Sequence, residues 1–118
     1  MEIFRTDEYV KMENPTPGVH FMQKILTNQQ KAEDMGGLFA VLAPRVERPL
    51  HYHEKRESII IALSGEAVEI VEGKETPIKA NDILYIPAQE KHAIANRTDK
   101  EFRYFEFFTQ PGEAPTRL

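Results

Sequence analysis

Three histidines have the chemistry and spacing needed to bind a metal ion. His51 and His53 are separated by one residue, so in an extended segment both point to the same face, with backbones roughly 7 Å apart, while Tyr52 points away. A third, His92, follows a turn led by Pro87. Three neutral imidazoles suit iron, zinc, copper or nickel, and they leave two or three coordination positions open for water, dioxygen or an oxygen-bearing ligand.

The residues around these histidines predict the strands that must position them. An apolar, β-branched run follows His53 and ends at Ser64 and Gly65, which indicates a buried strand closed by a tight turn. Near the third histidine, a turn at residues 81–82 precedes a short apolar strand, and a second strand begins at His92.

These two stretches resemble the paired motifs of the cupin superfamily. The first motif is His-x-His, a loop, Glu, an apolar strand and Gly; the second is Gly-Asp, a strand, Pro-x-Gly, then His and Asn. The resemblance covers about residues 40–108, and the matching residues stand in order at family spacing: His51, His53, Gly65, Asp82, Pro87, His92 and Asn96. It implies an all-β, cupin-like double-stranded β-helix or jelly-roll barrel that binds one divalent transition metal (Fe, Zn, Ni, Mn or Cu).

Three turn positions depart from the family pattern. Arg45 stands where the first motif usually opens with glycine, and Asn81 and Gln89 replace glycines of the second motif. Asn tolerates the left-handed backbone that a turn can require, whereas Gln there costs about 1 kcal/mol more than Gly. None of these departures removes a metal ligand.

The glutamate of the first motif can be assigned to two positions. Counting forward from His53 through the shorter permitted loop gives Glu57, whereas counting back from Gly65 along the strand gives Ser58. Loops absorb a one-residue change in length more easily than paired strands do, which favours Ser58 as the inward-facing residue. A β-bulge could still bring Glu57 to the ion, where it would favour manganese. The expected site is therefore the three histidines, with Glu57 as an alternative fourth ligand.

Four further residues are candidates for substrate binding. Arg45 and Arg48 precede the histidine pair at the expected rim of the barrel, where a guanidinium could bind a carboxylate or phosphate; a solvated surface arginine is the alternative. Tyr85 and Gln89 are candidates by position only, and each suits packing or a turn equally well.

Two polar residues could orient the metal-binding side chains without touching the ion themselves. Ser58 faces inward if the strand count holds, and Asn96 lies on the same strand face as His92. Asn96 could orient the site or, alternatively, satisfy backbone groups where the strand ends. His20 lies outside both motifs and is expected to be a structural or surface histidine.

Turn signals every 8 to 12 residues predict one all-β domain of roughly eight to ten strands. Residues 1–35 form an N-terminal arm and the first strands, residues 36–110 the barrel core with both motifs, and residues 111–118 a tail with no assigned role. A strand is expected over 19–26, then a hairpin connection over 28–37 or a helical turn within it, and a strand over 38–43 after two punctuating glycines.

An apolar outer face requires a cover. Ile59, Ile61 and Leu63 oppose the inward-facing Ile60 and Ala62 on the predicted strand, so both of its faces are apolar. Either the N-terminal arm or a second subunit must bury the outer one. Cupins are commonly dimers, so the resemblance implies a homodimer.

Composition excludes several classes of function. With 15 basic and 19 acidic residues, the net charge of −4 does not favour nucleic acid or an anionic membrane as a partner. Without cysteine, the chain has no disulfide, thiolate metal ligand or cysteine nucleophile. No apolar run approaches membrane-spanning length and the charged N-terminus lacks a signal-peptide core, so a cytoplasmic location is expected.

Three hypotheses for function remain open at this stage. The chain could be a small metal-dependent enzyme, since dioxygenase, isomerase and lyase activities occur among similar cupins. It could be a non-catalytic module that binds a small sugar or carboxylate, with or without metal. It could also be a metal-free homologue with vestigial histidines, although the presence of all three argues against this.

Overall fold

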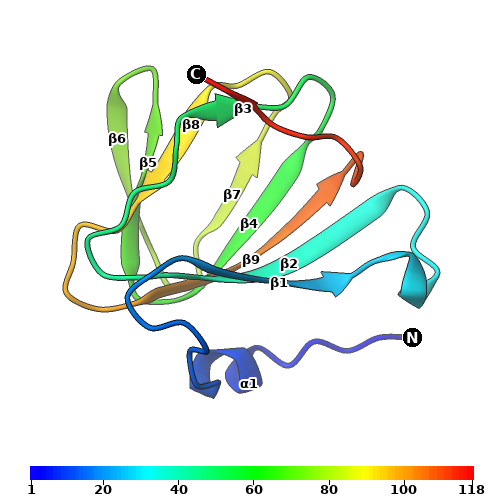
Figure 1. Cartoon of the computed structure of the whole chain (residues 1–118), viewed down its shortest axis with the longest axis horizontal. Helices are drawn as coiled ribbons and strands as arrows, with labels where there is room; N and C mark the ends of the chain where they lie inside the picture. The colour runs from blue at the N-terminus through cyan, green and yellow to red at the C-terminus, as the bar shows by residue number, and fades with distance from the viewer.

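Ten strands form two five-stranded antiparallel sheets in this computed structural model, which describes residues 1–118 (Figure 1). In spatial order, the first sheet contains β1 (Phe21–Leu26), β2 (Met35–Leu42), β9 (Phe102–Thr109), β4 (Ser58–Ser64) and β7 (Ile83–Ile86). The second contains β10 (Thr116–Arg117), β3 (His51–Tyr52), β8 (His92–Ala95), β5 (Glu66–Val71) and β6 (Lys74–Lys79). The predicted all-β barrel is confirmed.

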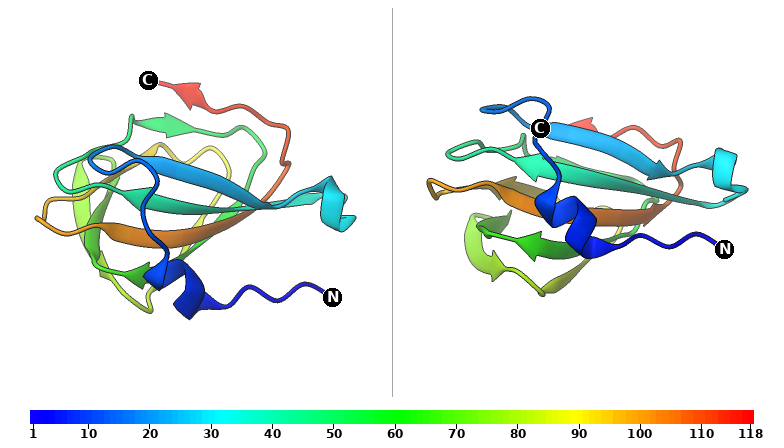
Figure 2. Two further views of the ribbon diagram at one scale, coloured as in Figure 1. Left: turned by 60° about the horizontal axis from the view of Figure 1, so that its bottom comes forward. Right: turned by 90° about the horizontal axis from the view of Figure 1, so that it is seen from below.

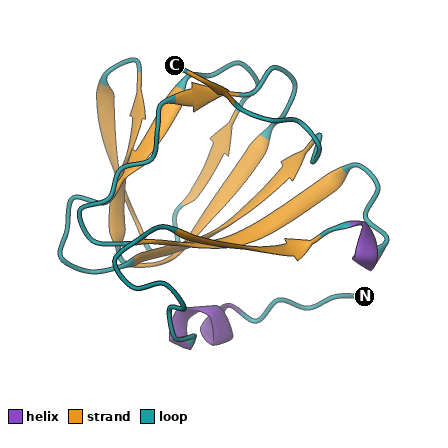
Figure 3. Cartoon of the chain, viewed as in Figure 1, coloured by secondary structure: helices purple, strands orange, loops and turns teal.

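The main core lies between the two sheets. Alternate residues of each strand face inward, so apolar side chains from both sheets meet in one cluster. Its buried members are Ala40, Leu42, Ile60, Ala62, Ala67, Ile78, Ile86, Ile94, Phe102 and Tyr104. Figure 3 shows how little helix accompanies the sheets, and no helix is long and apolar enough to cross a membrane.

The N-terminal arm covers much of the outer face of the first sheet. Its short helix α1 (Thr6–Lys11) lies against this sheet (Figure 2). The ring of Tyr9 lies 5.0 Å from Phe39 and 4.8 Å from Phe105, measured between ring centroids. Arg103 fixes the arm by donating hydrogen bonds to the carbonyls of Tyr9 and Met12. The arm therefore buries much of the apolar outer face, while Ile59 remains 44% exposed.

Strand β2 begins at Met35, three residues before the predicted start, because its glycines are part of the ladder. Gly36 pairs with Phe108, and Gly37 pairs with Phe107. A Cβ atom on either glycine would lie within 3 Å of the paired aromatic ring. These glycines therefore make room for aromatic side chains and do not interrupt the strand.

The segment between β1 and β2 is a hairpin connection, as predicted, with one turn of 3₁₀ helix, η1 (Asn28–Gln30). Thr27 caps this turn: its hydroxyl accepts from the backbone N–H of Gln29, and its own N–H donates to the side chain of Gln30. The turn lies at the end of the hairpin that β1 and β2 form (Figure 1).

All three turn positions that lack the family glycine adopt the left-handed backbone. The φ angles are 64° at Arg45, 76° at Asn81 and 69° at Gln89. The fold therefore keeps the turn geometry for which glycine is suited, at a cost of about 1 kcal/mol for a residue such as Gln.

Candidate metal and ligand site

The three histidines meet in a cavity of about 280 Å³ between the sheets. Its walls also carry two carboxyl groups, Glu69 and Glu106, and three guanidinium groups, from Arg48, Arg56 and Arg117. Side chains of both sheets and of the C-terminal segment therefore line the same cavity.

His51 and His92 stand directly opposite each other on the neighbouring strands β3 and β8. Their ring centroids are 4.5 Å apart, and the rings of His51 and His53 are 5.6 Å apart. Imidazoles that share one ion have centroids about 4.5 to 5.5 Å apart, because metal–nitrogen bonds are about 2.0 to 2.1 Å long. The spacing of His51 and His92 lies within this range, and that of His51 and His53 is just above it.

Hydrogen bonds fix the orientation of two of the rings. Nδ1 of His51 lies 2.9 Å from the carbonyl oxygen of Pro49, which can only accept, so this nitrogen carries the proton and donates. Nδ1 of His92 is bonded to Oε1 of Glu69. In both rings the Nε2 atom is then the one left for a metal, the arrangement that commonly supports metal-bound histidine.

The third ring is held less completely. Nδ1 of His53 is buried without a hydrogen-bond partner, and it lies 3.8 Å from Oε1 of Glu113. The backbone of His53 is better fixed, because its carbonyl accepts a 2.7 Å hydrogen bond from the N–H of Gln89. A buried nitrogen without a partner is costly in a folded protein, so His53 has a free donor or acceptor to offer to a ligand.

Burial and the neighbouring charges keep two of the histidines neutral. Burial lowers the pKa of His51 against a hydrogen bond to Pro49 that raises it, and the nearby His92, Arg117 and Arg48 lower it further. Burial and Arg56 lower the pKa of His53 to about 4. Neutral imidazole is the form that binds a metal, so these two rings are available at neutral pH.

His92 behaves differently because Glu69 is beside it. Burial alone would lower the pKa of His92, but the hydrogen bond and charge of Glu69 outweigh burial and raise it. Burial raises the pKa of Glu69 in turn. The two groups form a buried hydrogen-bonded pair, and the other carboxylate oxygen of Glu69 is buried without a partner.

The donor set suits a divalent transition metal, although the side chains do not yet converge on one point. No group of three His, Asp or Glu side chains is arranged closely enough to hold an ion as the rings stand. The ring spacing, the unpartnered Nδ1 of His53 and the free carboxylate oxygen of Glu69 nevertheless place the required donors around one cavity.

The two carboxylates of the cavity do not belong to the cupin motifs, which is why the sequence did not single them out. Glu69 is 5% exposed and lies on the inward face of β5 together with Ala67. Because side chains alternate along a strand, Val68 and Ile70 lie on the outer face. Glu106 lies opposite the inward-facing Ile60. A charged residue on the same strand face as buried apolar residues was the available signal.

Glu57 and Ser58 take opposite sides of β4. Ser58 is buried on the inward face, as the strand count predicts. Glu57 is exposed and accepts a hydrogen bond from the hydroxyl of Tyr85 on the outer surface. The structure therefore brings neither Glu57 nor Tyr85 to the cavity, and the carboxylates come from Glu69 and Glu106 instead.

Of the other predicted residues, some line the cavity and some do not. Arg48 lines the cavity, but Arg45 does not, because it pairs with Asp99 at 2.9 Å on the surface. Gln89 occupies an exposed turn and acts only through its backbone. The side chain of Asn96 donates to the carbonyls of residues 42 and 100 and accepts from the N–H of residue 98, which is the strand-end role.

The C-terminal tail, which had no predicted role, forms part of the site. It leaves β9 in the first sheet and crosses to the second, where β10 pairs with β3 (Figure 1). Pro115 and Arg117 both line the cavity. His20, expected to be structural or on the surface, also lines it, and burial lowers its pKa to about 4.

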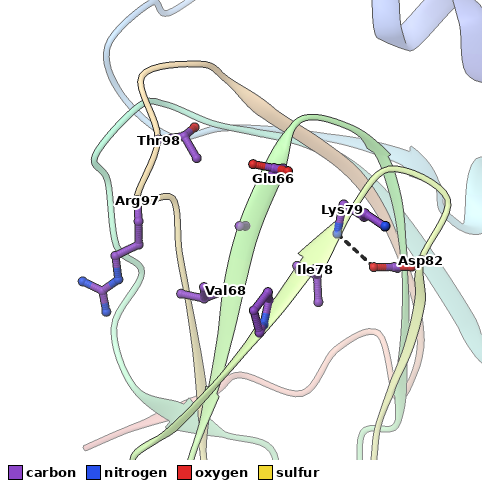
Figure 4. Close-up of a pocket in the computed structure, with 9 residues that line it drawn as sticks. Glu66, Val68, Ile78, Lys79, Asp82, Arg97 and Thr98 are labelled. Atoms are coloured by element: carbon purple, nitrogen blue, oxygen red, sulfur yellow. Dashed lines mark hydrogen bonds between the residues drawn. The ribbon is translucent and has the colours of Figure 1, made fainter.

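A second hollow of about 360 Å³ lies over β5, β6 and the turn after β8 (Figure 4). Its charged side chains do not converge on a centre. The carboxylate of Asp82 accepts from the backbone N–H of Lys79 at 2.9 Å, and Arg97 pairs with Glu75 at 2.8 Å. No histidine lines this hollow, so the histidine cavity is the candidate site.

Comparison with known proteins agrees with this structure. The model of the cupin domain family matches residues 38–108. The oxalate-binding protein of Thermotoga maritima is 37% identical over 81 residues, which cover 65% of this chain and 67% of that protein.

Solved structures share the barrel. A protein with a double-stranded β-helix domain from Klebsiella pneumoniae has a TM-score of 0.80 at 22% identity, over 100% of this chain and 97% of that one. A protein described as a predicted oxalate decarboxylase from Thermotoga maritima has a TM-score of 0.71 at 26% identity, over 76% of this chain and 79% of that one. The fold, the two motifs and the family match together show that this chain belongs to the cupin family.

Proposed function

We propose that the cavity binds one divalent transition metal through His51, His53 and His92, and that this ion holds a small carboxylate ligand. The observation that carries the proposal is the opposed pair of His51 and His92, with ring centroids 4.5 Å apart and both Nδ1 atoms already engaged. A bound ion would act as a Lewis acid toward an oxygen ligand. This chain's own residues would orient the rings and surround the ligand with charge.

The charges around the cavity favour an anionic ligand. Arg48 and Arg117 line it, and neither makes a side-chain hydrogen bond or ion pair within the chain. Planar guanidinium groups bind carboxylates with paired hydrogen bonds. The relative that binds oxalate supports the same class of ligand.

A metal-dependent lyase acting on such a carboxylate is the second candidate, favoured by Glu106. This carboxyl group lines the cavity from β9 and could hold a proton or deliver it to a bound ligand. Burial raises its pKa, and the charge of the nearby His92 acts in the opposite direction. Simple capture of the ligand needs no such group. Release of carbon dioxide from oxalate by the wild-type protein, and its loss in Glu106→Gln with metal retained, would distinguish the lyase from a binding protein.

The first test is elemental analysis of protein purified without added metal, beside a chelated control. One transition metal per chain would support the proposal, and its identity would narrow the chemistry. Iron would favour reactions that use dioxygen, whereas zinc, nickel or manganese would favour an isomerase, a lyase or ligand capture. Failure to take up any of these ions on titration would contradict the metal site and leave a metal-free binding module.

A further inference from the structure

The C-terminal segment carries an arginine to the edge of the histidine cavity. Arg117 of β10 pairs directly with His51 of β3, and His51 pairs directly with His92 of β8. Residues directly opposite on neighbouring antiparallel strands project to the same face. The guanidinium of Arg117 therefore continues the row formed by the two histidines.

The three arginines of the cavity differ in how they are held. Arg56 donates to the carbonyls of Gln110, Pro111 and Glu113, and its guanidinium lies 4.1 Å from the centre of the Phe108 ring, so it anchors the tail. The side chains of Arg48 and Arg117 make no such contacts, and both line the cavity beside His51. These two guanidinium groups therefore remain free for a ligand.

The segment that carries Arg117 is attached at only a few points. The carboxylate of Glu113 accepts from the N–H groups of Lys55 and Arg56 at 3.0 and 3.2 Å. The N–H of Leu118 donates to the carbonyl of Leu50 at 3.1 Å. Most of the segment is exposed and β10 is only two residues long, so it can open more easily than the strands of the barrel.

We infer that Arg117 is a ligand-binding residue, and that together with Arg48 it binds the outer carboxylate of a small dicarboxylate whose inner oxygens face the three histidines. This inference rests on the proposed function for the inner end of the ligand. A compact dicarboxylate such as oxalate presents two oxygens on each side, which fits an ion on one side and a guanidinium pair on the other. A cavity of about 280 Å³ has room for such a ligand.

The test compares oxalate binding by the wild type, Arg117→Gln and Arg5→Gln. Arg5 is exposed in the N-terminal arm, so its substitution removes the same charge far from the cavity. The metal content of each protein is measured first, and oxalate and then acetate are titrated into the metal-loaded proteins by calorimetry. Because hydrogen bonds to charged groups are strong, Arg117→Gln should weaken oxalate binding about tenfold or more, while acetate binding changes less than about twofold.

A second readout concerns the tail itself. Oxalate should slow amide hydrogen exchange at residues 116–118 in the wild type and not in Arg117→Gln. The reason is that a ligand bound to Arg117 stabilises the closed position of the segment. Arg117→Lys retains the charge without the planar fork and should recover only part of the affinity. Inorganic phosphate in place of oxalate separates the two classes of anion, and tighter binding of phosphate would overturn the dicarboxylate assignment.

The outcomes separate this inference from the proposed function. A wild-type protein that takes up no metal contradicts the metal site. A metal-loaded wild type whose oxalate affinity equals that of Arg117→Gln, or which binds no oxalate, overturns the role of Arg117 and leaves the metal site standing.

Discussion

Nδ1 of His92 is hydrogen-bonded to Oε1 of Glu69, a carboxylate that lies on the neighbouring strand β5. Both groups are buried, with exposed fractions of 9% for His92 and 5% for Glu69. The contact fixes the orientation of the ring and leaves Nε2 for a ligand.

Glu69→Gln should weaken metal binding about 10- to 100-fold, because loss of a carboxylate that orients a ligand histidine commonly has an effect of that size. Competition against a chromogenic chelator measures the affinity. Glu57→Gln is the matched control, since Glu57 faces the outer surface and should leave metal affinity unchanged. Equal losses in the two variants would show that Glu57 reaches the ion.

Replacement of His51, His53 or His92 by Ala should in each case abolish stoichiometric metal binding and leave the barrel folded, because the core between the sheets lies beside these rings and not on them. Elemental analysis measures the metal, and circular dichroism checks the fold. His20→Ala is the control from the same cavity wall and should retain the metal. Stoichiometric metal in two of the three variants would contradict the ligand set.

Gln89→Gly should stabilise the protein by about 0.5 to 1 kcal/mol, because it relieves a left-handed backbone in a non-glycine residue. Urea unfolding gives the free energy of unfolding. Gln23→Gly, at an exposed site within β1 with ordinary backbone angles, should instead destabilise the protein. A Gly variant at residue 89 that is less stable than the wild type would show that the Gln side chain contributes more than the strain costs.

His20 should make the protein less stable as the pH falls. Its pKa is about 4 in the folded chain against 6.5 for an ordinary histidine, so the unfolded state binds more protons between these values. The contribution of neutral His20 is complete above pH 6.5 and is lost as the pH falls toward 4. The difference between wild type and His20→Asn in urea midpoint, followed from pH 7.5 to pH 4, measures it. A difference that does not change with pH would mean that His20 is not buried as a neutral group.

Much of the fold and half of the site could be predicted from the sequence. The alternation of apolar residues and the regular turns predict the strands, because side chains on a strand face opposite sides in turn. The same alternation places Ser58 inward and Glu57 outward. The spacing of His51, His53 and His92 within two recognisable motifs predicts that they lie together, and the structure does place all three on one cavity.

Tertiary structure alone decided the rest of the site. Glu69, Glu106 and Arg117 stand in no motif, and they reach the histidines only through the register between strands that are far apart in the chain. Strand pairing over such separations depends on how whole sheets pack, which local patterns do not encode. The tail likewise has a polar sequence typical of a free end, and becomes part of the cavity wall because Glu113 and Arg56 bind backbone groups across it. The sequence thus determined the barrel and the three histidines, while the packing of the two sheets determined the charges that surround them.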